Sequence, residues 1–176
     1  MALKTKVIDW LSGMATGTAD PYWLTLAGRS GCGKTFLAKK ADHVFDRLCS
    51  YVSGGFQVGD MVRFSRPGAW IDCAELSTKT FAEQREAIIK AQGAWFCVID
   101  DLGAENHQNN FTVSQMLALM NRRLGKWTFI TSNLSIDKLG AIDERIASRL
   151  ERDGNQFIEI KSLGDWAHRD RQGRQA

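Results

Sequence analysis

The sequence 28-GRSGCGKT-35 decides the fold, and the rest of the chain is interpreted from it. Its glycines, lysine and threonine have the G-x-x-x-x-G-K-[ST] spacing of a phosphate-binding P-loop, and the apolar run 23–27 leads into it. In such a loop, backbone N–H groups surround the β-phosphate, the lysine reaches the β- and γ-phosphates, and the threonine hydroxyl binds Mg²⁺. The predicted nucleotide-binding residues are Gly28, Arg29, Ser30, Gly31, Cys32, Gly33, Lys34, Thr35 and Phe36.

Length and composition indicate one domain. The chain has 176 residues, of which 44% are hydrophobic, which is enough for one core and too few for two ordinary domains. The 23 basic and 20 acidic residues leave a net charge of +3, so composition alone indicates neither a nucleic-acid partner nor a membrane surface. The four cysteines lack C-x-x-C spacing, and no stretch approaches the ~20 apolar residues of a membrane span. We therefore expect a reduced, cytoplasmic setting and no targeting segment.

An acidic pair follows the apolar run 94–99, AWFCVI. A continuous apolar run without alternation is typical of a strand that is buried on both faces of a sheet. Asp100 and Asp101 at its end form a Walker B pattern, in which Asp100 would hold the Mg²⁺ and Asp101 would polarise the attacking water. Glu105 is the alternative for the second role.

A polar cluster ends the next predicted strand, 126–131. Thr131, Ser132 and Asn133 would lie at the C-terminal end of a central strand, which is where open α/β sheets bind ligands. Asn133 would there orient water and sense the γ-phosphate. The alternative is an Asx-type turn that caps the following segment.

Apolar periodicity and capping residues predict the remaining elements. The predicted strands are 22–27, 69–74, 94–99, 126–131 and 156–160. The predicted helices are 3–14, one from the P-loop to about Cys49, one from a Ser77 cap to Ala91, one containing 113–124, and one over 141–151 with Asp143 as its cap. Residues 1–20 would form an N-terminal helix, 21–160 the nucleotide-binding core and 161–176 a polar basic tail.

Two late arginines, Arg145 and Arg149, lie at i and i+4 and so project from one helix face. Asp143 and Glu144 could simply neutralise them at the surface. The more specific interpretation is an arginine finger, presented to the γ-phosphate of a neighbouring subunit.

Candidate DNA contacts lie in two places. Residues 53–67 form a predicted loop or small hairpin in which Arg63 and Arg66 accompany two phenylalanines, a combination that could bind single-stranded nucleic acid. An ordinary surface loop anchored by its apolar residues is the favoured alternative. Lys79 and Arg85 lie on the following predicted helix, where solvated charge is the simpler interpretation.

The ordered blocks GRSGCGKT, WFCVIDDLGAE, NRRLGKWTFITSNLS and ERIASRL resemble the AAA+ ATPases of the DnaC-type helicase loaders and their relatives, the IstB-type transposition ATPases. The resemblance covers about residues 20–160. It implies a P-loop NTPase α/β fold with a parallel sheet in the order 5-1-4-3-2 between two helical layers. It also implies ATP and Mg²⁺ as ligands, assembly into a ring or spiral, and single-stranded DNA and a replicative helicase as partners.

Carried onto this sequence, the resemblance makes Asn133 sensor 1 and Arg149 the trans-acting finger. Arg145 matches the other arginine of that block, and Arg123 matches a recurrent arginine without an assigned role. Three features depart from the family. We expect no N-terminal helicase-binding domain, and we expect a reduced or absent lid, with Arg169 a poor substitute for sensor 2. The pair Asp-Asp replaces the more common Asp-Glu, which predicts slow turnover.

The motifs together predict a slow, helicase-loader-like ATPase that assists DNA replication, and the short chain suggests a virus or mobile element. One alternative is an IstB-like transposition ATPase on duplex DNA. A second, from another class, is a small-molecule P-loop kinase. A third is a nucleotide-gated scaffold with negligible hydrolysis.

Overall fold

A five-stranded parallel sheet lies at the centre of the protein in the computed structural model, which describes residues 3–20, 22–53, 68–104, 110–152 and 154–161. The strands are β1 (Trp23–Gly28), β2 (Ala69–Asp72), β3 (Phe96–Asp100), β4 (Trp127–Ser132) and β5 (Gln156–Ile160). The helices are α1 (Leu3–Thr16), α2 (Lys34–Ser53), α3 (Cys73–Leu76), α4 (Phe81–Gly93), α5 (Asn110–Arg123), α6 (Ile136–Ile142) and α7 (Glu144–Leu150).

The strand order is β2-β3-β4-β1-β5, so the predicted order 5-1-4-3-2 is confirmed. All neighbouring strands are parallel, and β1 pairs with both β4 and β5. Every residue of β3 and β4 is buried, as predicted for β3 from its continuous apolar run. Because parallel strands end at the same edge of a sheet, the residues that follow β1, β3 and β4 lie together.

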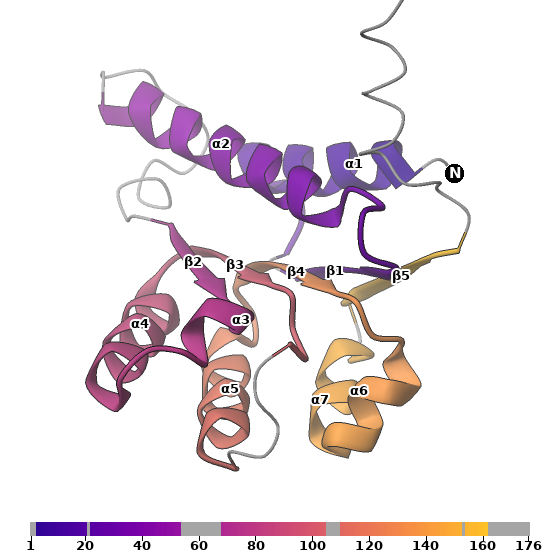
Figure 1. Ribbon diagram of the computed structural model, residues 1–176. Helices are drawn as coiled ribbons and strands as arrows, with labels where there is room; N and C mark the ends of the chain where they lie inside the picture. The colour runs from indigo at the N-terminus through magenta and orange to yellow at the C-terminus, as the bar shows by residue number, and fades with distance from the viewer. Residues whose placement is uncertain (1–2, 21, 54–67, 105–109, 153, 162–176) are drawn as a thin grey trace, which may run out of the picture.

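Helices cover both faces of the sheet (Figure 1). α1 and α2 pack on one face through an aromatic core, in which the Trp10 ring lies 5.2 Å from that of Trp127 and 5.6 Å from that of Phe129. The other helices pack on the opposite face over a mostly aliphatic core that includes Ile88 and Met116. The two cores hold the sheet rigid from both sides, and this fixes the edge where the motifs lie.

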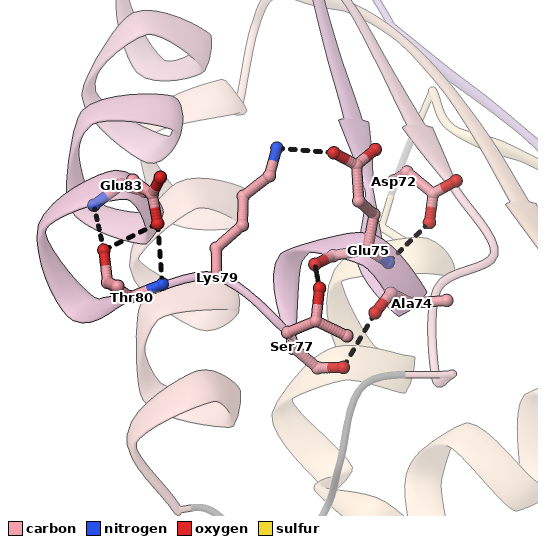
Figure 2. A network of polar contacts seen from close by, with 8 residues as sticks. Asp72, Ala74, Glu75, Ser77, Lys79, Thr80 and Glu83 are labelled. Carbon is pink, nitrogen blue, oxygen red and sulfur yellow. Dashed lines mark hydrogen bonds and ion pairs between the residues drawn. The ribbon is translucent and has the colours of Figure 1, made fainter.

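β2 is shorter than predicted. The strand ends at Asp72, and residues 73 and 74, which the sequence places in it, begin the short helix α3. The carboxylate of Asp72 accepts a hydrogen bond of 2.9 Å from the backbone N–H of Glu75 and so caps α3 (Figure 2). An N-cap carboxylate thus ends the strand where hydrophobicity alone continues it.

The predicted Ser77 cap of α4 is also wrong. Ser77 is the C-cap of α3, and its hydroxyl donates to the carbonyl of Ala74 at 2.7 Å. The N-cap of α4 is Thr80, which forms a capping box with Glu83: the Thr80 hydroxyl accepts from the Glu83 N–H, and the Glu83 carboxylate accepts from the Thr80 N–H (Figure 2). Two reciprocal bonds outweigh the single one that Ser77 could offer.

Other boundaries differ less. α1 continues to Thr16 and α2 to Ser53, and the predicted helix 141–151 is divided at Asp143, which ends α6 and caps α7. β5 has its predicted bounds. The predicted loop 53–67, apart from its first residue, and residues 162–176 of the tail lie outside the described residues, as do Glu105, Arg63, Arg66 and Arg169. Within the described part of the chain, no helix is long and apolar enough to span a membrane.

Candidate nucleotide-binding site

The P-loop connects β1 to α2 at the sheet edge where β3 and β4 also end. Gly33 has a φ of 90°, in the left-handed region that side chains disfavour. A Cβ on Gly28 would lie 2.9 Å from the carbonyl oxygen of Ile160 on β5, so only glycine fits there. Backbone geometry therefore accounts for both glycines that bound the motif.

Lys34 lies in the loop with its side chain nearly buried. Its ammonium group donates to the carbonyls of Gly28 and Arg29, each at 2.9 Å, and to Oδ1 of Asn133 at 2.8 Å. The acceptors that the described residues offer this cation are neutral, so its charge is not neutralised by a direct ion pair there and can attract an anion.

Thr35 and Asp100 meet in the same region. The Thr35 hydroxyl donates to Oδ1 of Asp100 at 3.1 Å, and the hydroxyl of Thr131 donates to the same oxygen at 2.5 Å. Magnesium prefers oxygen ligands and commonly takes one or two from the protein, with waters and substrate phosphates completing its shell. The Thr35 hydroxyl oxygen and the Asp100 carboxylate fit that requirement. Among the described residues, no group of three or more His, Cys, Asp and Glu side chains could form a self-sufficient metal site.

Asn133 connects Lys34 to Asp101. Its Nδ2 donates to Oδ1 of Asp101, while its Oδ1 accepts from Lys34, so both ends of the amide have the polarity that their partners require. Burial raises the pKa of Asp101, the nearby carboxylate of Asp100 raises it further, and Lys34 opposes the shift. A carboxylate with a raised pKa is a better proton acceptor than one in free solution.

The pocket at this edge has a volume of about 260 Å³. It is lined by Ser30, Gly31, Gly33, Lys34, Thr35, Phe36, Asp101 and Asn133. An apolar groove of about 540 Å³ adjoins it between α1 and α2, and the two share Gly33 and Phe36. The site therefore has a polar compartment at the P-loop and a neighbouring apolar compartment between α1 and α2.

The late arginines do not line this pocket. Arg145 forms an ion pair with Asp143, with an N···O distance of 2.6 Å, and this contact lowers the pKa of Asp143. Arg149 donates to Oδ1 of Asn121 at 2.7 Å and to the carbonyl of Arg145 at 2.6 Å. Arg145 is exposed and Arg149 is half-buried on α7, and neither lines the phosphate pocket of its own chain.

The predicted DNA contacts that the structure describes, Lys79 and Arg85, lie on the outer side of the α3–α4 region. Lys79 is paired with Glu75 at 2.9 Å (Figure 2), whereas Arg85 is exposed on α4. Neither residue lines the pocket at the sheet edge.

Two residues near the ends of β4 have contacts that the sequence does not reveal. Thr131 contacts both Walker B residues, and the only signal for it is its place in the polar cluster after an apolar run. Arg123 is fully buried and donates to backbone carbonyls of three segments, a role that its position in a helix does not indicate.

No protein-family model and no curated protein matches this chain. Solved structures do match it. They include DnaI, with 20% sequence identity and a TM-score of 0.65 over 92% of this chain and 84% of that one. They also include the replication initiator DnaA bound to AMPPCP and single-stranded DNA, with 18% identity and a TM-score of 0.63 over 89% of this chain and 44% of that one.

A further match is the RuvB Holliday junction branch migration motor of Thermotoga maritima, with 15% identity and a TM-score of 0.53 over 90% of this chain and 44% of that one. The chain thus spans less than half the length of the DnaA and RuvB chains. At these identities the matches show the fold alone. The chain has the AAA+ P-loop NTPase fold, with a DnaI-like arrangement of sheet and helices, as the resemblance of its motifs implies.

Proposed function

We propose that the protein binds and hydrolyses ATP with Mg²⁺ and acts as a helicase-loader-like accessory protein in DNA replication. The observation that carries the proposal is the chain of contacts from Lys34 through Asn133 to Asp101, beside the Thr35–Asp100 pair. Groups that would bind phosphate, hold Mg²⁺ and accept a proton thus lie together at one edge of the sheet, which is the arrangement that nucleotide hydrolysis requires.

Each compartment has a role in this proposal. Lys34 would bind the β- and γ-phosphates, and Thr35 and Asp100 would hold the Mg²⁺, which neutralises charge on those phosphates. Asp101 would accept the proton of the attacking water, and Asn133 would orient that water and respond to the γ-phosphate. The apolar groove beside Phe36 would take the base.

Arg149 is the better candidate for an arginine finger that completes a neighbouring subunit's site. Arg145 is already bound to a carboxylate, whereas the acceptors of Arg149 are an amide and a backbone carbonyl. Exchanging neutral partners for a phosphate is more favourable than breaking an ion pair. ATP would then join subunits in a ring or spiral, and slow hydrolysis would release them.

Single-stranded DNA and a replicative helicase are the proposed partners. The similar DnaA structure contains AMPPCP and single-stranded DNA, which supports this choice over duplex DNA. Arg85, exposed on α4, is the described residue best suited to contact a phosphate backbone, together with Lys79 and, outside the described residues, Arg63 and Arg66. Binding to single-stranded and duplex DNA, measured at the same salt concentration, separates this proposal from an IstB-like role.

Nucleotide binding is tested with a fluorescent ATP analogue. Lys34→Ala should abolish binding, because no other described cation lines the phosphate pocket. Lys39→Ala is the matched control, since Lys39 is an exposed lysine of the same helix that lines neither compartment. Unchanged affinity in Lys34→Ala would remove the basis of the phosphate assignment.

Assembly and hydrolysis are tested together. Light scattering should show an oligomer with a non-hydrolysable ATP analogue, and Arg149→Ala should prevent it while sparing nucleotide binding. Arg47→Ala, on α2, serves as the surface control. Mixing Arg149→Ala with Asp101→Ala protein should restore some release of phosphate, because each variant completes what the other lacks. If the protein stays monomeric in every condition and phosphorylates a small molecule, it is a kinase instead.

A further inference from the structure

One buried hydroxyl connects the two acidic residues of the site. Thr131, on β4, is 1% exposed, and its hydroxyl donates to Oδ1 of Asp100 at 2.5 Å. The hydroxyl oxygen of Thr131, Oγ1, in turn accepts a hydrogen bond of 2.9 Å from the backbone N–H of Asp101. A hydroxyl can donate one hydrogen bond and accept others, so this side chain satisfies a carboxylate and a backbone amide at once.

The backbone at Asp101 needs such support. Its φ is 59°, and Asp101 is the one described residue other than glycine with a positive φ. A side chain in this left-handed region costs free energy and persists only where its surroundings hold it. The next residue along the chain has its own hydrogen bond, because the N–H of Leu102 donates to the backbone carbonyl of Thr131 at 2.8 Å. The turn that begins at Asp101, at the end of β3, is called the Asp101 corner below. Thr131 thus holds this corner through its side chain at Asp101 and through its backbone at Leu102.

We propose that Thr131 is a positioning residue of the ATPase site, which sets the Asp100 carboxylate and the Asp101 corner relative to each other. Thr131 does not line the phosphate pocket, so it acts through the two aspartates and not on the nucleotide. This inference rests on the proposed function. It assigns the task to the hydroxyl of Thr131 and not to the bulk of its side chain.

A matched pair of substitutions separates hydroxyl from bulk. Thr131→Val keeps the shape of the side chain and removes both hydrogen bonds. Thr25→Val makes the same change one strand away, since Thr25 on β1 lies opposite Ile130 of β4 and is also fully buried. Within the described residues, the Thr25 hydroxyl has no hydrogen-bond partner, so its loss should change nothing at the site.

The first readout is the rate of amide hydrogen exchange in the absence of nucleotide, which is measured by NMR. In Thr131→Val, the Asp101 amide loses its acceptor and should exchange about tenfold faster, the factor that corresponds to one ordinary hydrogen bond. The Leu102 amide is the internal control, because its acceptor is the backbone carbonyl of Thr131, which valine retains. Thr131→Ser should keep both amides at their native rates.

The second readout is the separation of kcat from KM in ATP hydrolysis. Thr131→Val should lower kcat by about 10- to 100-fold, the effect of displacing a reacting group slightly. KM for ATP should change by less than about threefold, because the P-loop contacts remain. Thr131→Ser should restore kcat and Thr25→Val should leave it unchanged. If valine prevents folding, Thr131→Ala removes the same hydroxyl without the bulk.

The outcomes distinguish this inference from the function on which it rests. If the native protein hydrolyses no ATP, the proposed function is contradicted. Hydrogen exchange at the Asp101 amide would still test whether the Thr131 hydroxyl holds Asp101 in place. If the native protein hydrolyses ATP, and Thr131→Val has the native exchange rate at the Asp101 amide and the native kcat, the inference is overturned. A Thr131→Ser variant as impaired as Thr131→Ala would also overturn it, because it would assign the effect to packing.

Discussion

Replacing Arg123 by methionine should destabilise the fold without touching the nucleotide site. Arg123 ends α5 with its side chain fully buried, and burial lowers its pKa. Its carbonyl accepts from the Trp23 indole at 3.0 Å. Its guanidinium donates to Thr128 Oγ1 at 3.1 Å and to the carbonyls of Ala91 (3.1 Å), Ala94, Trp95 (3.3 Å) and Trp127 (2.5 Å). One side chain therefore joins the end of α4 to the beginnings of β3 and β4.

The magnitude follows from what methionine leaves behind. Each buried carbonyl without a donor costs about 1–3 kcal/mol, so the three that are buried, those of Ala91, Ala94 and Trp127, cost roughly 3–9 kcal/mol. Removing a buried cation relieves a desolvation penalty of several kcal/mol, which offsets part of this cost. A net loss of about 3–5 kcal/mol is a large part of the ~5–15 kcal/mol that stabilises a typical domain. For a chain of this length, it corresponds to a fall in Tm of about 6–20 °C.

Urea denaturation followed by tryptophan fluorescence measures this loss directly. Arg122→Met is the matched control, because Arg122 is the preceding residue of α5 and is exposed. It should lose less than about 1 kcal/mol, the contribution of a cation at the end of a helix. Arg123→Lys should fall between the two, since an ammonium group cannot reach five acceptors at once. If Arg123→Met is as stable as Arg122→Met, the buried network does not stabilise the fold.

Two further predictions concern the site and the α3–α4 junction. ATP hydrolysis should fall as the pH drops through the pKa of Asp101, because a protonated carboxyl cannot accept a proton from water. The hydrogen bond from Asn133 lowers that pKa. Asn133→Ala should therefore move the acid limb of the kcat profile to higher pH than in the native protein. Both proteins use the same substrate, so ionisation of ATP contributes equally to the two pH profiles. If the acid limbs of the native and Asn133→Ala profiles coincide, Asp101 is not the titrating group. Thr80→Ala should lower the free energy of unfolding by about 1 kcal/mol, as loss of an N-cap does, whereas Ser77→Ala should cost less than half of that. Equal losses in urea denaturation would contradict the assignment of Thr80 as the cap.

The arrangement of the sheet edge could be predicted from the sequence because each motif follows a buried strand. A parallel sheet brings the residues after its strands to one edge, so the P-loop, Asp100 and Asn133 had to meet once their strands were identified. The contacts of Lys34 with Asn133 and of Thr35 with Asp100 are the result. Roles that depend on a second subunit, such as that of Arg149, stay predictions.

Capping residues and buried polar groups could not be assigned in the same way. Ser77 and Thr80 are equivalent candidates by residue type, and only the reciprocal bond with Glu83 separates them. Arg123 and Arg122 are adjacent arginines at the end of one helix, yet one is fully buried and the other is exposed. Which of the two turns inward depends on carbonyls that lie about thirty residues away along the chain.

The two ends of β4 have different tasks, and this makes the main predictions independent. Trp127 and Thr128, where the strand begins, accept hydrogen bonds from Arg123, whereas Thr131 and Ser132, where it ends, hold the corner after β3. Substitutions without shared partners act additively. Arg123→Met should therefore lower Tm while kcat, measured well below Tm, stays within about twofold of native, since the donors at the corner are intact. Thr131→Val should lower kcat more than its small effect on Tm explains. If both variants lost activity in proportion to stability, β4 would be a purely structural strand.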